Sequence, residues 1–108
     1  MHAQLIHYRW DGDVEEFMAK AEPAAPVIAA MDGLVAKYWL RAEGGLFASL
    51  YLWRDQESAD AYAKGEFLRI ALLELPGIRD VKVEDYSLWA DPTAVTTAGI
   101  FADRPAPA

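Results

Sequence analysis

Histidine is the side chain best suited to acid–base chemistry near neutral pH, and this chain has two, His2 and His7. His2 lies at the N-terminus, where we expect it to be solvated. His7 lies in an alternating segment, on the same face as Leu5 and Arg9. Two interpretations stay open: a structural histidine held by a hydrogen bond in a sheet or interface, or a general base that deprotonates a bound molecule. Under the second, His7 is the candidate catalytic residue.

Side chains that could form a pocket around such a base come from several segments. A base of this kind works best in a dry, apolar pocket with donors that stabilise an anion. The candidate donors are Arg9, Arg41, Tyr38, Tyr51 and Tyr62. Four tryptophans at predicted strand ends either fill the core or form a wall for a flat ligand. The predicted substrate-binding set is Trp39, Trp53, Tyr51, Tyr62 and Arg41.

Several other chemistries lack the residues they need. The chain has no cysteine, which excludes disulfides, thiol nucleophiles and cysteine-ligated metals. Two histidines without ligand spacing make a poor metal site. Gly44 and Gly45 precede a predicted strand rather than a helix, so they are no phosphate loop, and no serine sits in a nucleophile elbow. We therefore predict no metal site and no cofactor.

Length and composition fit one small domain. The 108 residues carry a net charge of -7, which argues against nucleic acid and anionic membranes as partners. No signal-peptide pattern or long apolar run is present, so we expect a soluble cytoplasmic protein. The hydrophobic fraction of 54% is high for a globular domain, and an interface or pocket should absorb the excess.

The hydrophobic pattern predicts two strand–helix–strand units. Alternation predicts strands at residues 3–10, 34–42, 46–54 and 78–89, and helical spacing predicts helices at 14–21, resuming at 27–31 after two prolines, and at 56–75. This order favours a ferredoxin-like α+β fold, with an antiparallel sheet and two helices on one face. We expect one domain over residues 1–101, including a C-terminal arm over 93–101, and a loose tail over 102–108.

The third predicted strand indicates how the domain assembles. Residues 45–53 carry no charge, so both faces of this strand should be covered. The helices of one chain can cover only one face of the sheet. Two sheets packed face to face would cover the other, which predicts a homodimer of the dimeric α+β barrel type.

Short segments of the sequence also resemble a known family. They are Gln4 to Tyr8 (QLIHY), Lys37 to Trp39 (KYW), Leu50 to Asp55 (LYLWRD) with Glu57 to Tyr62 (ESADAY), and Pro76 to Ile78 (PGI). In these segments, and over residues 3 to 98 as a whole, the chain resembles the YdhR-type putative monooxygenase family. That family belongs to the dimeric α+β barrel group, with the antibiotic-biosynthesis monooxygenases.

The resemblance implies a homodimer and cofactor-independent oxidation of a phenolic or quinol-like aromatic molecule. In that scheme a base such as His7 deprotonates a phenol, and the electron-rich anion reduces O2. The chain has no asparagine, so the pocket asparagine of several relatives cannot transfer, and its second helix lacks the axial histidine of the haem-degrading branch. Two alternatives stay open: a non-catalytic module that binds an aromatic metabolite, or an isomerase or lyase on the same scaffold.

Overall fold

The computed structural model describes residues 1–97, which form one four-stranded antiparallel sheet with helices. The strands are β1 His2–Trp10, β2 Leu34–Arg41, β3 Leu46–Trp53 and β4 Ile78–Ser87. The helices are α1 Val14–Ala21, α2 Ala25–Ala29, α3 Gln56–Lys64, α4 Glu66–Leu68 and α5 Ala90–Thr97. The strand order β2-β3-β1-β4 is that of the ferredoxin-like fold, so the predicted fold class is confirmed. The predicted boundary at residue 101 and the tail over 102–108 lie outside the described residues.

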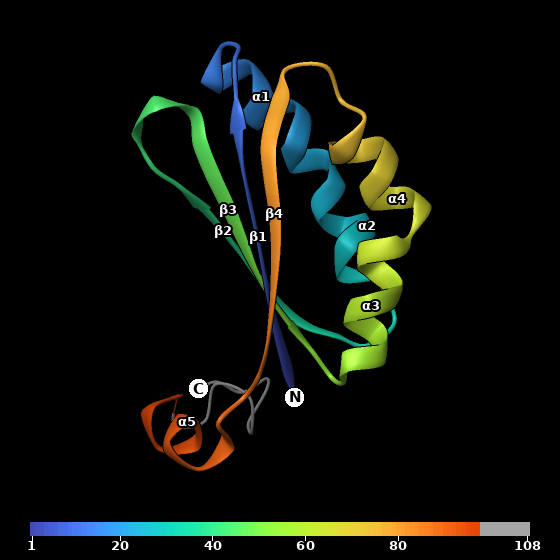
Figure 1. Ribbon diagram of the computed structural model, residues 1–108, viewed down its shortest axis with the longest axis vertical. Coiled ribbons are helices and arrows are strands. Elements are labelled where there is room, and N and C mark those ends of the chain that lie inside the picture. Colours follow the sequence, from blue (N-terminus) through green and yellow to red (C-terminus); the bar gives the residue numbers. More distant parts are fainter. Residues whose placement is uncertain (98–108) are drawn as a thin grey trace.

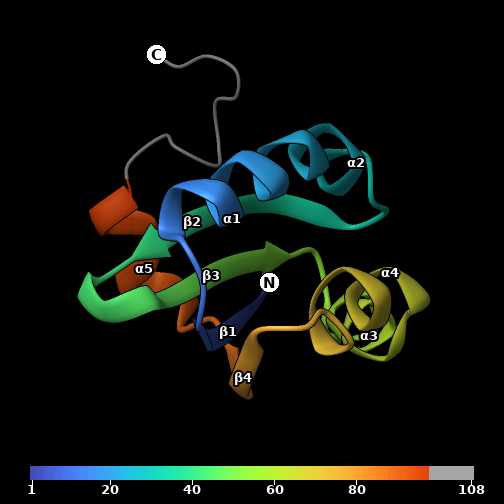
Figure 2. The same ribbon diagram turned by 90° about the horizontal axis from the view of Figure 1, so that it is seen from above.

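Helices α1 to α4 lie on one side of the sheet, and α5 lies beyond its end (Figure 1). Seen from above, α1 and α2 run along β2, while α3 and α4 lie toward β1 and β4 (Figure 2). We call the helix side the covered face and the other side the open face. Within residues 1–97, no helix is long and apolar enough to cross a membrane.

The core forms where alternate residues of the two central strands meet the helices. Along β1, the even-numbered residues from His2 to Tyr8 are buried, while their odd-numbered neighbours are half-buried. The register pairs Gln4 with Tyr51 and Ile6 with Ser49, so residues of the same face lie side by side. The covered face is therefore built from the even positions of β1 and the odd positions of β3.

Local signals set the ends of the helices and the hairpin. Asp13 caps α1 by accepting a hydrogen bond from the backbone N–H of Glu15, and Asp55 caps α3 through the N–H of Ser58 at 2.8 Å. Gly44 and Gly45 both take positive φ between β2 and β3, which a side chain would oppose. These connections agree with the sequence prediction and place β3 directly beside β2.

One helical prediction needs correction, and one helix was not predicted. The helix expected over 56–75 is broken at Gly65, which is extended (φ -78°, ψ 162°), and continues as α4 and a π-helical turn, Arg69–Leu73. Glycine is, after proline, the residue least favoured in a helix interior, so the helix is easily interrupted at Gly65. Residues 90–97 form α5, a helix that we did not predict, at the start of the segment that we expected to be a C-terminal arm. Pro92 lies in the first turn of α5, where a missing N–H costs nothing.

Candidate active site

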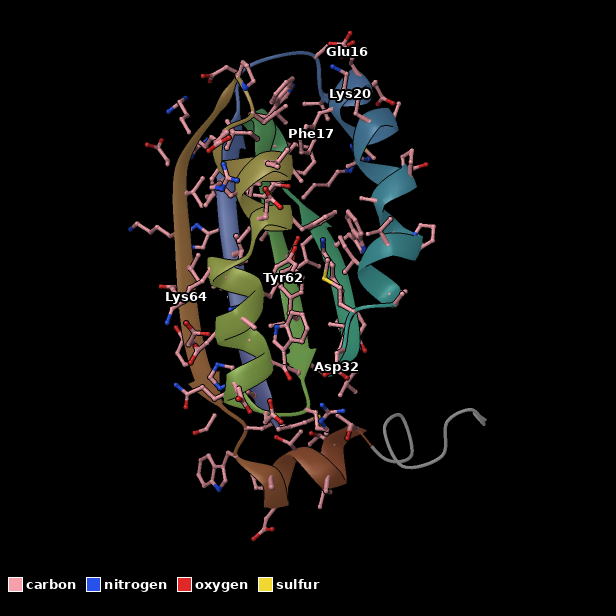
Figure 3. The ribbon with its side chains drawn as sticks, turned by 90° about the vertical axis from the view of Figure 1, so that its right-hand side faces the viewer. Glu16, Phe17, Lys20, Asp32, Tyr62 and Lys64 are labelled. Carbon is pink, nitrogen blue, oxygen red and sulfur yellow. The ribbon has the colours of Figure 1, made fainter. Side chains whose placement is uncertain are left out.

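A cavity of about 250 Å³ lies between the covered face and the helices. Figure 3 looks onto the helices, and Phe17 of α1 and Tyr62 of α3 project between the two helical segments toward the sheet. Leu68, Leu72 and Ala71 of α4 and the π-helical turn also line this space. The break at Gly65 and the wider turn that follows it thus shape one wall. π-Turns within helices often occur at functional sites.

The sheet supplies most of the polar groups of the cavity. Because side chains alternate along a strand, Tyr8 of β1, Ser49 and Tyr51 of β3, and Lys37 of β2 all face the helices. Trp39 lies two residues after Lys37 on the same face. Tyr62 lies on the buried face of α3, which begins after the Asp55 cap, so its side chain points toward the sheet. A mostly apolar cavity with a few converging polar groups is the usual form of a small-molecule site.

The buried tyrosines form a hydrogen-bonded aromatic cluster. The hydroxyls of Tyr51 and Tyr62 lie 2.7 Å apart and the ring centroids 4.8 Å apart. Burial raises the pKa of Tyr8 to about 12, and burial also raises the pKa of Tyr51 and that of Tyr62. All three are therefore neutral phenols near pH 7. They can donate hydrogen bonds to an anion in the cavity, but they are poor proton acceptors.

Lys37 is the functional candidate that the sequence interpretation missed. Its Nζ lies 3.5 Å from the ring centroid of Trp39 and 4.8 Å from that of Tyr51. Within residues 1–97, no carboxylate lies within ion-pair distance of this amine. Burial lowers the pKa of Lys37 to about 8. Its signal was in the sequence: it shares a strand face with Trp39, which we had predicted to line a pocket.

The predicted substrate-binding residues divide into three groups. Trp39, Tyr51 and Tyr62 line the cavity. Arg41 lines an adjacent pocket of about 460 Å³, where its Nη1 lies 3.4 Å from the sulfur of Met18. Trp53 does not line the cavity: it is 1% exposed, stacks on Tyr51, and donates from Nε1 to Oε1 of Gln4 at 3.0 Å. Trp53 thus supports the cavity wall from behind.

The structure separates His7 from this cavity. His7 pairs in register with Ala48 and Lys82, at an odd position of β1, and so faces the open side. Its Nε2 lies 3.5 Å from Oε1 of Glu84. The cavity and the candidate base therefore lie on opposite faces of one sheet.

The expectation that His2 is solvated is wrong. β1 begins at residue 2, and its even positions face the helices, so His2 is 6% exposed and its Nε2 lies 2.9 Å from Oδ1 of Asp85. The two histidines thus lie on opposite faces of β1. Within residues 1–97, no group of three His, Cys, Asp or Glu side chains is placed to hold a metal ion.

The sequence matches the family described as "Putative mono-oxygenase ydhR" over residues 4–99, and the chain belongs to that family. No curated protein matches the sequence.

Solved structures share its fold at low sequence identity. SnoaB, a cofactor-independent oxygenase from Streptomyces nogalater, is 13% identical with a TM-score of 0.66, over 81% of this chain and 91% of that one. The haem degrader MhuD from Mycobacterium tuberculosis is 14% identical with a TM-score of 0.65, over 84% and 98%. NE2512 of Nitrosomonas europaea, of unknown function, is 17% identical with a TM-score of 0.65, over 82% and 89%.

Proposed function

We propose that the cavity on the covered face is the active site of a cofactor-independent monooxygenase that acts on a phenolic or quinol-like aromatic molecule. One observation carries this proposal: the cavity is walled by Trp39, Tyr51 and Tyr62, and its polar groups are mainly hydroxyls, with the amines of Lys37 and Lys20. Flat aromatic walls suit an aromatic ring. The hydroxyls are donors for an oxyanion that forms on that ring.

The reaction needs only the substrate and O2. The phenol loses its hydroxyl proton, and the electron-rich phenolate transfers an electron to O2. The radical pair then joins at a ring carbon to form a peroxide. After protonation, loss of water with the hydrogen of that carbon leaves a quinone. In sum, one phenol and one O2 give one quinone and one water, and the four electrons that reduce O2 all come from the substrate.

Membership of the YdhR family and the shared fold with SnoaB support this reaction class. SnoaB is described as a cofactor-independent oxygenase, which makes the same chemistry reasonable on this scaffold. This chain has no asparagine, unlike several oxygenases of the same group, so other side chains of its cavity must supply the polar contacts.

We further infer that the working unit is a homodimer joined through the open face. This face carries Tyr38, Leu40 and Tyr86, which are 43%, 47% and 56% exposed. Leu5 and Leu50 lie opposite each other on the two central strands of the same face. An exposed apolar surface of this kind marks an interaction site. A partner sheet would bury on the order of 1,200–2,000 Å² in total.

The experiment is a screen of phenols, hydroxynaphthalenes and hydroquinones, followed by tryptophan fluorescence for binding and by an oxygen electrode for turnover. We expect a bound phenol to consume one O2 per quinone formed, and ¹⁸O2 to place one labelled oxygen in the product. The purified protein should lack any visible flavin or haem band and any stoichiometric metal. Trp39→Ala should weaken binding, since it removes wall area.

The other outcomes distinguish the alternatives. Binding without O2 uptake would identify a non-catalytic binding module. Conversion of the ligand without O2 would identify an isomerase or lyase. A visible cofactor band that is needed for turnover would refute the cofactor-independent mechanism.

A further inference from the structure

The amine of Lys37 lies in the wall of the cavity in which we propose that a phenol binds. Its stem comes from β2, and its Nζ lies against the faces of Trp39 and Tyr51 within the cavity wall. An aromatic ligand in this cavity therefore meets an amine directly. The faces of these rings displace water from the amine but supply no negative charge. They therefore stabilise the ammonium form less than water and a carboxylate would.

The charged and titratable groups around Lys37 come from each element that packs against the cavity. They are Tyr8 of β1, Tyr51 of β3, Tyr62 of α3 and Lys20 of α1. In the adjacent pocket lie Arg41 of β2 and Glu22, which follows α1. Among residues 1–97, none that lines the 250 Å³ cavity is acidic. Because Lys37 is buried among phenol and indole rings without a carboxylate beside it, it loses its proton more readily than a surface lysine.

We propose that Lys37, in its neutral form, is the base that accepts the hydroxyl proton of the phenolic substrate. This inference rests on the proposed function for its substrate class. The O–H bond of the phenol breaks, an N–H bond forms at Nζ, and an ammonium–phenolate pair remains in the cavity. No oxidant takes part in this step. The ammonium left beside the phenolate then stabilises its charge.

The other groups in the cavity are less suited to this role. Burial raises the pKa of Tyr8 to about 12 and lowers that of Lys37 to about 8. The deprotonated form, which is the form that accepts a proton, is therefore available at a far lower pH for Lys37 than for Tyr8. A base works best when its pKa lies near the working pH. Lys20 lies on α1 (Figure 3) and is exposed, whereas Lys37 is half-buried.

Three variants distinguish the possible roles of Lys37: a proton acceptor, a positive charge, or only a part of the cavity wall. Lys37→Met keeps the apolar stem but removes the amine. Lys37→Arg keeps a positive charge that is not lost at any pH of the assay. Lys64→Met is the matched control, an exposed lysine at the end of α3 that does not line the cavity (Figure 3). Melting temperature and circular dichroism identify variants that fail to fold.

The first measurement does not require turnover. The probe is 2-naphthol, whose anion absorbs at longer wavelength than the neutral form. The assay is run at about pH 8.5, where Lys37 is mostly neutral. In the parent and in Lys64→Met, we expect binding to form the naphtholate without net proton release, because Lys37 takes up the proton. Lys37→Arg should form the naphtholate and release one proton per probe bound. Lys37→Met should keep the naphthol neutral.

The second measurement uses a substrate found by the oxygen screen. For a phenol of high pKa, kcat/KM of the parent should rise with pH through about 8 and then level. Both Lys37 variants should lose roughly 10²–10⁴ in kcat, the usual contribution of a general base, and lack the rise near pH 8. Their KM should change far less than their kcat.

Either measurement can overturn the proposal. Full activity in Lys37→Arg would show that Lys37 acts only by its charge. Proton release by the parent on binding 2-naphthol, or a naphtholate in Lys37→Met, would show that another group governs ionisation. If no phenol is oxidised, the proposed function fails, and the 2-naphthol experiment still decides whether Lys37 accepts a phenolic proton.

Discussion

The two faces of the sheet are built from alternate residues of the same strands, yet they have different chemistry. On the covered face, polar side chains are buried and paired: Gln4 is 0% exposed, donates to the carbonyl of Ala59 at 3.1 Å and accepts from Trp53 at 3.0 Å. The open face carries half-buried and exposed apolar side chains such as Leu5 and Leu40. The difference separates two roles: the covered face is suited to binding a small ligand, and the open face to binding a second sheet.

The largest effect should follow from placing a charge on the open face. Leu50→Glu puts a carboxylate opposite Leu5, at the centre of the inferred dimer contact. A buried unpaired charge is costly, and central interface residues each contribute about 2 kcal/mol or more, which is about 30-fold in the dimer dissociation constant. Sedimentation at micromolar concentration should show a dimer for the parent and mainly monomer for the variant.

A matched control tests whether the face, rather than the new charge, matters. Ile70→Glu places the same carboxylate on the helical side of the molecule, where Ile70 is 56% exposed. We expect this variant to remain dimeric. A monomeric parent, or equal dissociation of both variants, would contradict the inferred interface.

The sheet could be predicted from the sequence because its signals are local. Alternation along residues 3–10 and 46–54, the glycines at 44 and 45, and the caps at Asp13 and Asp55 each act within a few residues. The break at Gly65 could not be predicted with the same means. A single glycine costs a helix about 1 kcal/mol, and packing of the following segment decides whether the chain bends there.

The next effect concerns the covered face and its hydroxyl pair. Tyr51→Phe or Tyr62→Phe should each lower the free energy of unfolding by about 1–2 kcal/mol, because a buried hydroxyl loses its partner. The double variant should be about as stable as either single one, or more stable, since no unpaired hydroxyl remains there. Urea denaturation of all four proteins gives the coupling energy directly. Additive losses would show that the two hydroxyls do not act as a pair.

The candidate site shows where sequence interpretation reaches its limit. Trp39, Tyr51 and Tyr62 could be predicted because large aromatics at strand and helix spacing point inward. The face of His7 was also readable, since it lies two residues after Leu5 on the same face of the strand, but which face closes over a cavity depends on how the helices pack. The position of Lys37 on the strand face of Trp39 was readable, but lysine as a residue type does not indicate a base. The low pKa of Lys37 arises from burial among aromatic rings contributed by different strands.

A smaller effect tests the burial of Lys37 through stability. Its pKa falls from 10.5 to about 8 on folding, so the protonated form is disfavoured in the native state. Below pH 8 both states are protonated and the native state bears the full penalty. Between about pH 8 and 10.5 the unfolded chain binds more protons, so this residue makes stability rise with pH.

Lys37→Met should therefore melt a few degrees above the parent at pH 7, and the difference should shrink toward pH 10.5. Lys64→Met provides the reference, because it makes the same substitution at an exposed position outside the cavity. Thermal melts at three pH values suffice. A constant difference across this range would contradict a depressed Lys37 pKa.

The smallest expected effect concerns His7, and it tests directly whether the reaction takes place on the covered face or on the open face. Its ring faces the open side beside Glu84, so His7→Gln should leave phenol oxidation by the folded dimer within about two-fold of the parent. The variant loses the His7–Glu84 contact, as does the control Glu84→Gln, so both should lower the melting temperature slightly and to a similar extent. A fall of 10²-fold or more in turnover for His7→Gln alone, with the dimer intact, would restore His7 as the general base. It would also place the chemistry on the open face, between two sheets, because no side chain at an odd position of β1 can reach a cavity on the other face.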